Sequence, residues 1–157
     1  MIHYPEVMRR AQAQIDEVVG RDRLPSFSDR EQLPYIEAMV KEVLRWRPVG
    51  PIGLPRQTAE DDYYNGYFIP KGTLILLNVW AMNRDPTYFP DYDDFRPERY
   101  LDDSGALVCV GKDISNQALF INIAALLWAF DFQPTVGEDE KPDIPSKTNC
   151  VDEGLVV

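Results

Sequence analysis

Three short motifs in this sequence combine residue types that could do chemistry. Glu42 and Arg45 lie three residues apart in an amphipathic stretch, where a helix would place them on one face as an ion pair. The segment Phe95–Tyr100 reads Phe-Arg-Pro-Glu-Arg-Tyr, and Cys109-Val110-Gly111 brings a thiol to the start of an apolar segment. Taken singly, such an ion pair is common on protein surfaces, and such a cysteine is usually a small buried hydrophobe. Their order along the chain is more informative than any one of them.

The stretches between these motifs extend the pattern. They are, in order, Leu33-Pro34-Tyr35, Arg47-Pro48, Pro55-Arg56-Gln57-Thr58, Tyr67-Phe68-Ile69-Pro70-Lys71-Gly72-Thr73 and Asn83-Arg84-Asp85-Pro86. Together with the three motifs, this series resembles the C-terminal part of the cytochrome P-450 family, the haem-thiolate monooxygenases, and looks closest to fungal members. The resemblance runs from about Pro5 to about Phe130, with a fainter similarity at 152–156.

The resemblance implies a structural role for three charged residues. Glu42 and Arg45 would form a buried ion network with Arg99, which would hold the loop on the haem side to its helix. Because a buried charge is stable only when it is paired, the loss of one member should cost several kcal/mol. Arg56 matches a position at which the family often places a cation against a haem propionate, and a guanidinium can make a bidentate contact there. The other interpretation of Arg56 is an exposed loop arginine.

The resemblance also implies a cofactor, haem, and its ligand. Cys109 matches the axial ligand to the haem iron, and a thiolate in that position favours cleavage of the O–O bond of bound oxygen. The helix that begins near Asp113 would direct its positive N-terminal end toward the sulfur, and Gly111 would let the backbone pass close to the porphyrin. The loop that lines the substrate pocket in the family corresponds here to Val49, Gly50, Ile52 and Leu54.

The segment before Cys109 departs from the family pattern. The family has a phenylalanine, a glycine and an arginine ahead of this cysteine, whereas the corresponding positions hold Asp102, Gly105 and Leu107. Cys109 also follows Arg99 by only ten residues, a shorter interval than in the family. We therefore expect an internal deletion just before Cys109. It would remove the aromatic residue that shields the sulfur, the glycine turn and a basic residue near a propionate.

Two functional hypotheses follow. By family resemblance, the protein is a haem-dependent monooxygenase that inserts one atom of O₂ into a small organic substrate, with electrons from an NADPH-dependent flavoprotein reductase. The alternative is a truncated, catalytically inactive chain with weak or no haem binding. No stretch resembles the family's long central helix with its acid–alcohol pair for oxygen activation. Pro5–Val19 resembles the helix just after it, so we expect Met1 to lie inside a longer frame of which this chain is the last third.

Apolar periodicity predicts three helices. They cover Pro5–Val19, a stretch that ends at Arg47-Pro48, and Ile114–Phe130. Ser28 and Glu31 are spaced as a capping box, although Pro34 would interrupt that helix and could instead open the next one. Ile114–Phe130 is apolar nearly all round, which predicts burial. Without the helices that normally cover it, this segment would leave an exposed patch, so we expect the chain to associate.

Strand signals are short. Asn65-Gly66 between aromatic residues predicts a hairpin, and the apolar run Thr73–Val79 predicts a short buried strand. Residues 80–84 could form a helical turn, and residues 137–157 form an acidic tail that we expect to be weakly structured. The expected fold class is mainly α with small β hairpins (α+β), an incomplete C-terminal part of the cytochrome P-450 fold. The chain 1–157 would then be a single partial domain.

Composition narrows the remaining choices. The 157 residues are 45% hydrophobic, which suits a globular core, and the net charge of −10 disfavours binding to nucleic acid or an anionic membrane. Two cysteines cannot build a disulfide framework. The sequence contains no apolar run of about 18 residues, so it predicts no membrane span. Family members typically reside in the endoplasmic-reticulum membrane. Because no anchor or signal peptide is evident in this sequence, the expected location is cytoplasmic or unknown.

Overall fold

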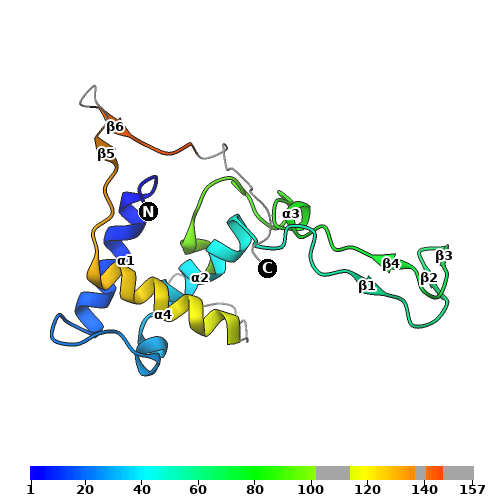
Figure 1. The fold of residues 1–157 in the computed structure, drawn as a ribbon, viewed down its shortest axis with the longest axis horizontal. Coiled ribbons are helices and arrows are strands. Elements are labelled where there is room, and N and C mark those ends of the chain that lie inside the picture. Colours follow the sequence, from blue (N-terminus) through cyan, green and yellow to red (C-terminus); the bar gives the residue numbers. More distant parts are fainter. Residues whose placement is uncertain (102–113, 137–140, 147–157) are drawn as a thin grey trace.

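Residues 1–101, 114–136 and 141–146, which the computed structural model describes, form four α-helices, two 3₁₀ helices and three small antiparallel strand pairs (Figure 1). The helices are α1 (Pro5–Val18), η1 (Phe27–Gln32), α2 (Pro34–Trp46), α3 (Val79–Met82), η2 (Pro97–Tyr100) and α4 (Ile114–Ala129). The strand pairs are β1 (Arg56–Gln57) with β4 (Leu74–Ile75), β2 (Asp62–Tyr64) with β3 (Tyr67–Ile69), and β5 (Thr135–Val136) with β6 (Pro142–Asp143). This is the mainly α, α+β class that the sequence predicts.

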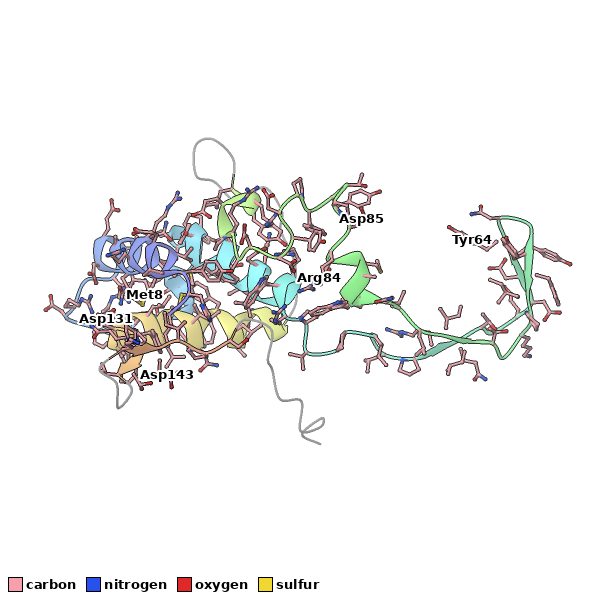
Figure 2. All side chains as sticks on the ribbon, turned by 90° about the horizontal axis from the view of Figure 1, so that it is seen from above. Met8, Tyr64, Arg84, Asp85, Asp131 and Asp143 are labelled. Carbon is pink, nitrogen blue, oxygen red and sulfur yellow. The ribbon has the colours of Figure 1, made fainter. Side chains whose placement is uncertain are left out.

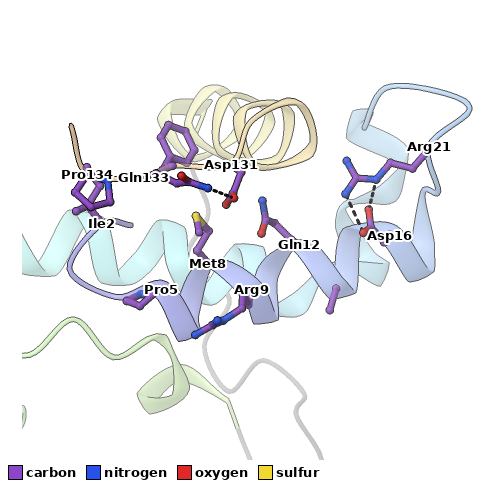
Figure 3. A pocket seen from close by; sticks show the side chains of 12 residues that line it. Ile2, Pro5, Met8, Arg9, Gln12, Asp16, Arg21, Asp131, Gln133 and Pro134 are labelled. Atoms are coloured by element: carbon purple, nitrogen blue, oxygen red, sulfur yellow. Dashed lines mark hydrogen bonds and ion pairs between the residues drawn. The ribbon is translucent and has the colours of Figure 1, made fainter. Parts of the chain in front are cut away.

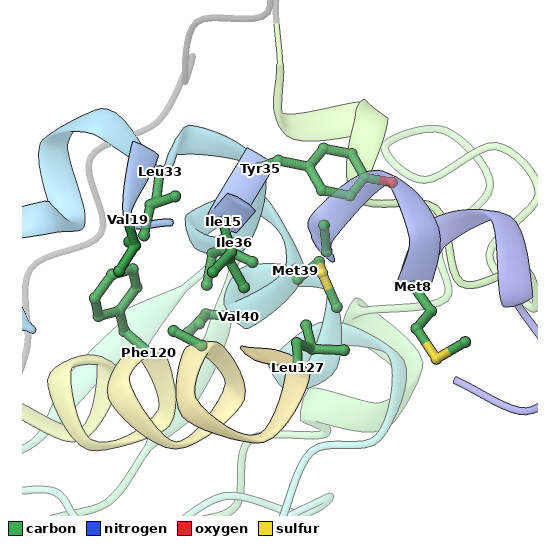
Figure 4. Packing of buried hydrophobic residues seen from close by; sticks show 12 residues of the cluster. Met8, Ile15, Val19, Leu33, Tyr35, Ile36, Met39, Val40, Phe120 and Leu127 are labelled. Carbon is green, nitrogen blue, oxygen red and sulfur yellow. The ribbon is translucent and has the colours of Figure 1, made fainter. Parts of the chain in front are cut away.

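The core lies between α1, α2 and α4. Figure 4 shows side chains from these helices, such as Ile15, Ile36 and Phe120, gathered in one cluster. Phe120, Ile15 and Ile36 are all 0% exposed. Full burial of one such side chain stabilises the folded chain by about 1.5–3 kcal/mol, so these contacts supply the cohesion of the helical part.

Proline and glycine set the limits of the first two helices. Pro5 and Pro34 occupy the first turns of α1 and α2, where the missing N–H has no intrahelical partner to lose. Gly20 follows α1 with a φ of +74°, a backbone conformation that glycine adopts without strain. Pro34 therefore opens the second helix, as one of the two sequence interpretations predicted.

The predicted cap at Ser28 and Glu31 is wrong by two residues. The residue that precedes η1 is Ser26, and its backbone N–H donates to the carboxylate of Asp29 over 2.8 Å. Arg23 holds the same carboxylate through hydrogen bonds of 2.6 and 2.7 Å. The buried, doubly held Asp29 therefore takes the role that the sequence pattern assigned to Glu31, which is exposed.

Residues 49–80, here called the arm, extend away from the helical part of the molecule (Figure 1). The predicted Asn-Gly hairpin is confirmed: Asn65 and Gly66, with φ of 50° and 84°, connect β2 to β3. The prediction of a buried strand at Thr73–Val79 is wrong, because only Leu74–Ile75 is a strand and Leu74 is 62% exposed. Figure 2 shows the side chains of the arm projecting outward, with no second layer of the described residues covering them.

One side of α4 is also uncovered. Phe120, Ala124 and Leu127 are buried, whereas Leu126 is 47% exposed and Phe130, just after the helix, is 58% exposed. The predicted burial of this segment therefore holds for one face only, and Leu126 and Phe130 are apolar side chains that stay exposed. No helix in the described parts of the chain combines the length and the apolar character needed to cross a membrane.

Candidate functional site

Glu42 is the centre of a buried ion network. Its side chain is 0% exposed, and Arg45, one turn further along α2, donates to it twice, over 2.8 Å from Nε and 2.7 Å from Nη2. Arg99 Nε of η2 lies 3.2 Å from the same carboxylate, and the backbone N–H of Arg96 donates to it over 2.8 Å. The structure thus brings together the three charged residues that the sequence grouped, and adds the Arg96 N–H, which no side-chain pattern could indicate.

The two arginines carry the network into the loop 83–96, which connects α3 to η2. Both guanidinium groups donate to backbone carbonyl oxygens of this loop. The distances are 3.0 Å to Asn83, 2.8 Å to Tyr92 and 3.2 Å to Asp94 for Arg45, and 3.0 Å to Pro90, 3.3 Å to Asp91 and 3.4 Å to Asp94 for Arg99. Because arginine has five donors in a fixed plane, each can hold several carbonyl groups while it pairs with Glu42.

The C-terminal end of α2 meets the same loop through other groups. Trp46 Nε1 donates to the carbonyl of Asp93 over 2.7 Å, and Asn83 Nδ2 donates to the carbonyl of Arg45 over 3.1 Å. The guanidinium of Arg84 lies 3.2 Å from the ring centroid of Trp80 and donates to the carbonyl of Trp46. Burial, followed by the nearby positive charges, lowers the pKa of Arg84 from its ordinary value. The loop is therefore bonded to α2 near both of its ends.

A second cluster, which the sequence did not indicate, connects α1, α2 and η2. The hydroxyl of Tyr35 donates to Glu98 Oε1 over 2.7 Å, and Arg10 Nη1 donates to the same oxygen over 3.0 Å. The Arg10 guanidinium also lies 4.6 Å from the centroid of the Tyr35 ring. Burial, and then the bond to Glu98, raise the pKa of the Tyr35 hydroxyl above its ordinary value. The two central residues of the Pro-Glu-Arg-Tyr motif, Glu98 and Arg99, are therefore both anchored to helices.

The residues assigned to ligand binding lie on the arm. Val49, Ile52 and Leu54 are 84%, 60% and 76% exposed, and Gly50 and Arg56 are exposed as well. The backbone N–H of Trp80 donates to the carbonyl of Pro51, which ties this loop to the start of α3. The structure therefore separates these five residues from the Glu42 network. Cys109 and Gly111 lie outside the described residues, and α4 begins five residues after Cys109.

The described residues line an open groove and a smaller cavity. The larger is an open groove of about 770 Å³ between α1 and residues 131–134 (Figure 3). Its polar groups are engaged with one another, as in the Asp16–Arg21 ion pair, and Gln12 donates to the carbonyl oxygens of Leu127 and Phe130. The smaller, of about 240 Å³, lies at the start of the chain beside Trp46. No group of three metal-ligating side chains occurs among the described residues.

Comparison with known proteins decides the family. The family model for Cytochrome P450 matches residues 1–153. The chain belongs to the cytochrome P450 family. Its relatives include Cytochrome P450 monooxygenase 58 of Postia placenta, 58% identical over 99% of this chain and 33% of the relative. A cytochrome P450 monooxygenase of Armillaria gallica is 49% identical over 99% of this chain and 34% of its own length. Another, claR of Ampulloclitocybe clavipes, is 44% identical over 88% and 28%.

Two features of these alignments concern length. The chain spans about a third of the length of these curated relatives. The alignment with the Postia placenta protein is 175 residues long, whereas this P450 chain has 157 residues, so at least 18 aligned positions of the relative have no counterpart here.

The family implies haem as cofactor. The described residues suit it chemically, since the exposed apolar side chains Ile52 and Leu54 adjoin Arg56, and haem is a flat apolar ring with anionic propionates.

Proposed function

We propose that this chain is the haem-side, C-terminal segment of a fungal-type cytochrome P450 monooxygenase. The observation that carries the proposal is the match of residues 1–153 to the family, together with the intact Glu42–Arg45–Arg99 network. In this proposal Cys109 is the axial ligand to the haem iron, Gly111 passes close to the porphyrin and Arg56 pairs with a propionate. Bound haem would supply the chemistry that activates O₂ for insertion into a substrate.

The contribution of the described residues is positional. The Glu42 network fixes the loop 83–96 and η2 to α2, and the Tyr35–Glu98–Arg10 cluster fixes the same motif from the other side. In the sequence, Cys109 follows η2 by nine residues, so both clusters fix the element that precedes the cysteine segment. We infer that these residues position the ligand segment and take no part in the reaction itself.

Substrate and partners follow from the family and stay within the proposal. Val49, Gly50, Ile52 and Leu54 would line the pocket of a small organic substrate, since three of them present exposed apolar side chains. Electrons would come from an NADPH-dependent flavoprotein reductase, the redox partner typical of the family. We also propose that residues 1–157 form a single partial domain with an acidic tail from residue 137.

A second candidate is an inactive chain that binds haem weakly or not at all. The observation that favours it is the set of at least 18 aligned positions without a counterpart here. A deletion just before Cys109 would account for them, because the sequence is shortened there relative to the family pattern. The loss would remove the groups that shield the sulfur and bind a propionate.

The reduced, carbon-monoxide difference spectrum of the purified chain after addition of haem separates the two candidates. A strongly red-shifted Soret band would show thiolate ligation, and Cys109→Ala should abolish it while Cys150→Ala, the matched control, leaves it unchanged. A band of nitrogen-ligated haem, or no band, would favour the inactive chain. Loss of the band in Cys150→Ala alone would show that Cys109 is not the ligand.

A further inference from the structure

The turn between β2 and β3 carries the one asparagine of the sequence that is followed directly by a glycine. Asn65 and Gly66 are both exposed, and their φ angles of 50° and 84° belong to the tight connection between Tyr64 and Tyr67. Beyond its chain neighbours, no described residue comes within 4 Å of the point where a side chain of Gly66 would begin. The peptide bond between Asn65 and Gly66 is therefore uncovered.

The side chain of Asn65 is also unrestrained. Within the described ranges of the chain, neither a hydrogen bond nor an ion pair holds it. The other asparagines whose side chains the structure describes are Asn78, Asn83 and Asn122, and each hydrogen-bonds a backbone group, over 3.0, 3.1 and 2.8 Å. Each of these three also precedes a residue with a bulky side chain, whereas Gly66 has none. Asn65 thus differs from them both in the freedom of its amide and in the access to it.

These two differences favour one reaction, the loss of ammonia from the Asn65 side chain. The backbone nitrogen of Gly66 can attack the side-chain carbonyl carbon because no Cβ of the glycine obstructs the approach. That nitrogen loses its proton and bonds to Cγ, the Cγ–Nδ2 bond breaks, and ammonia leaves with the proton. Water then opens the resulting five-membered imide at one of its two carbonyl carbons, which gives aspartate or isoaspartate. No oxidant or reductant takes part.

Ring closure needs local motion of the turn, and the arm permits it. The strands β2 and β3 pair over three residues each, and a two-stranded ladder this short is at best marginally stable. Tyr64 and Tyr67, which flank the turn, are 67% and 76% exposed, so little packing holds it closed. Segments with few buried contacts open locally at a free-energy cost far below that of global unfolding.

We propose that Asn65 is a site of spontaneous deamidation in the folded chain, with water as the second reactant and ammonia as the leaving product. The reaction adds a carboxylate to a hairpin that already contains Asp62, and isoaspartate also adds a methylene group to the backbone of the turn. Because the pairing of Tyr64 with Tyr67 depends on that two-residue turn, the isoaspartate form should lose the β2–β3 register. This site is independent of the proposed haem chemistry.

Incubation of the purified chain at mildly alkaline pH, followed by trypsin digestion and mass spectrometry, tests the proposal. Trypsin releases Asn65 within residues 57–71, and both Asn78 and Asn83 within residues 72–84. Peptide 57–71 should gain the mass of an exchange of NH₂ for OH several-fold faster than peptide 72–84, as two products that separate by chromatography. The rate should rise with pH, because the attacking nitrogen must lose its proton. A parallel incubation in urea should give a similar rate, since the fold does not protect Asn65.

Gly66→Ala and Gly72→Ala are the matched variants. Gly66→Ala places a methyl group beside the attacking nitrogen, so it should slow deamidation several-fold whether or not the hairpin keeps its shape. Gly72→Ala strains another turn of the arm, at a φ of 82°, but leaves Asn65 and Gly66 in place, so the rate should be unchanged.

Three results would overturn the proposal. The first is an unmodified peptide 57–71 from the folded chain when the chain in urea reacts, which would show that the turn protects Asn65. The second is an equal mass gain in peptide 72–84, which would remove the selectivity for this site. The third is an unchanged rate in Gly66→Ala, which would exclude attack by the Gly66 nitrogen.

Discussion

The helical part of the molecule and the arm contain similarly apolar sequence, but only the helical part buries it. Leu33 and Ile36 are 0% exposed, whereas Leu74, Leu76 and Leu77 in the arm are 62%, 52% and 47% exposed. Three helices with apolar stripes can cover one another, and α1, α2 and α4 do so. Strand pairs of two or three residues cannot, because an isolated two-stranded ladder has no second layer to pack against.

The same division runs through the candidate site. The groups that we propose to position the cysteine segment, Glu42, Arg45 and Arg99, lie in the buried part and satisfy one another there. The residues proposed to contact haem or substrate, such as Arg56 and Leu54, lie on the exposed arm. The structural half of the site is therefore self-contained, whereas the half that would meet ligands presents an open apolar surface. Substitutions in the buried network and in the exposed arm should therefore differ sharply in their effect on the free energy of unfolding.

The largest effect is expected at Glu42. Glu42→Gln keeps the shape of the side chain but leaves the buried guanidinium of Arg45 and its neighbour Arg99 without a counter-charge. Removing one partner of a buried pair costs about 3–5 kcal/mol, which is a large share of the stability of a chain this size. We expect the urea midpoint, followed by circular dichroism, to fall steeply or the cooperative transition to disappear.

The control for this change is Glu6→Gln. Glu6 pairs with Arg9 on the outside of α1, where its side chain is 85% exposed, and such pairs contribute about 0–1 kcal/mol. Its urea midpoint should stay close to that of the unmodified chain. Equal losses for Glu42→Gln and Glu6→Gln would mean that the Glu42 network is not a determinant of the fold.

A smaller loss of stability, but a more direct comparison of the two regions, is expected from truncating one leucine in each of them. Leu33→Ala opens a space in the buried cluster and should cost about 2–5 kcal/mol. Leu74→Ala removes the same atoms from an exposed strand and should stay within about 0.5 kcal/mol. Both are measured by urea unfolding. A loss of several kcal/mol for Leu74→Ala would show that the arm is packed in solution.

What the sequence predicted correctly was local. The helices at Pro5 and Pro34 and the hairpin at Asn65-Gly66 follow from apolar spacing, proline position and turn chemistry, all of which act within a few residues. The burial of Thr73–Val79 was predicted wrongly because an apolar run indicates only that a segment could be covered. Whether it is covered depends on surfaces from elsewhere in the structure.

The site shows the same limit. The pairing of Glu42 with Arg45 is a three-residue spacing, but Arg99 joins them from 57 residues away, and only the family resemblance indicated it. No resemblance indicated the bond between Tyr35 and Glu98, 63 residues apart, so it was missed. The hydrogen bond from the backbone N–H of Arg96 to Glu42 could not be predicted from residue types. Every residue but proline carries that donor, so the sequence does not mark the one that is used.

The smallest effect is a pH dependence in the helical part, at the start of η1. Hydrogen bonds from Arg23, and further ones from Ser26, hold the pKa of the Asp29 carboxyl well below its ordinary value. A carboxyl whose pKa is lower in the folded chain stabilises that state above the unfolded pKa of about 3.9, and this stabilisation is lost as the pH falls toward the folded value. Asp29→Asn should therefore destabilise the chain at pH 7 more than at about pH 2. The urea midpoints of the two proteins at both pH values measure this difference.

Asp91→Asn is the control for this pH dependence. It alters a carboxylate that is 64% exposed and paired with Arg96, so its effect on the urea midpoint should change little between the two pH values. The same gap between Asp29→Asn and the unmodified chain at both pH values would mean that Asp29 stabilises η1 by packing rather than by its charge.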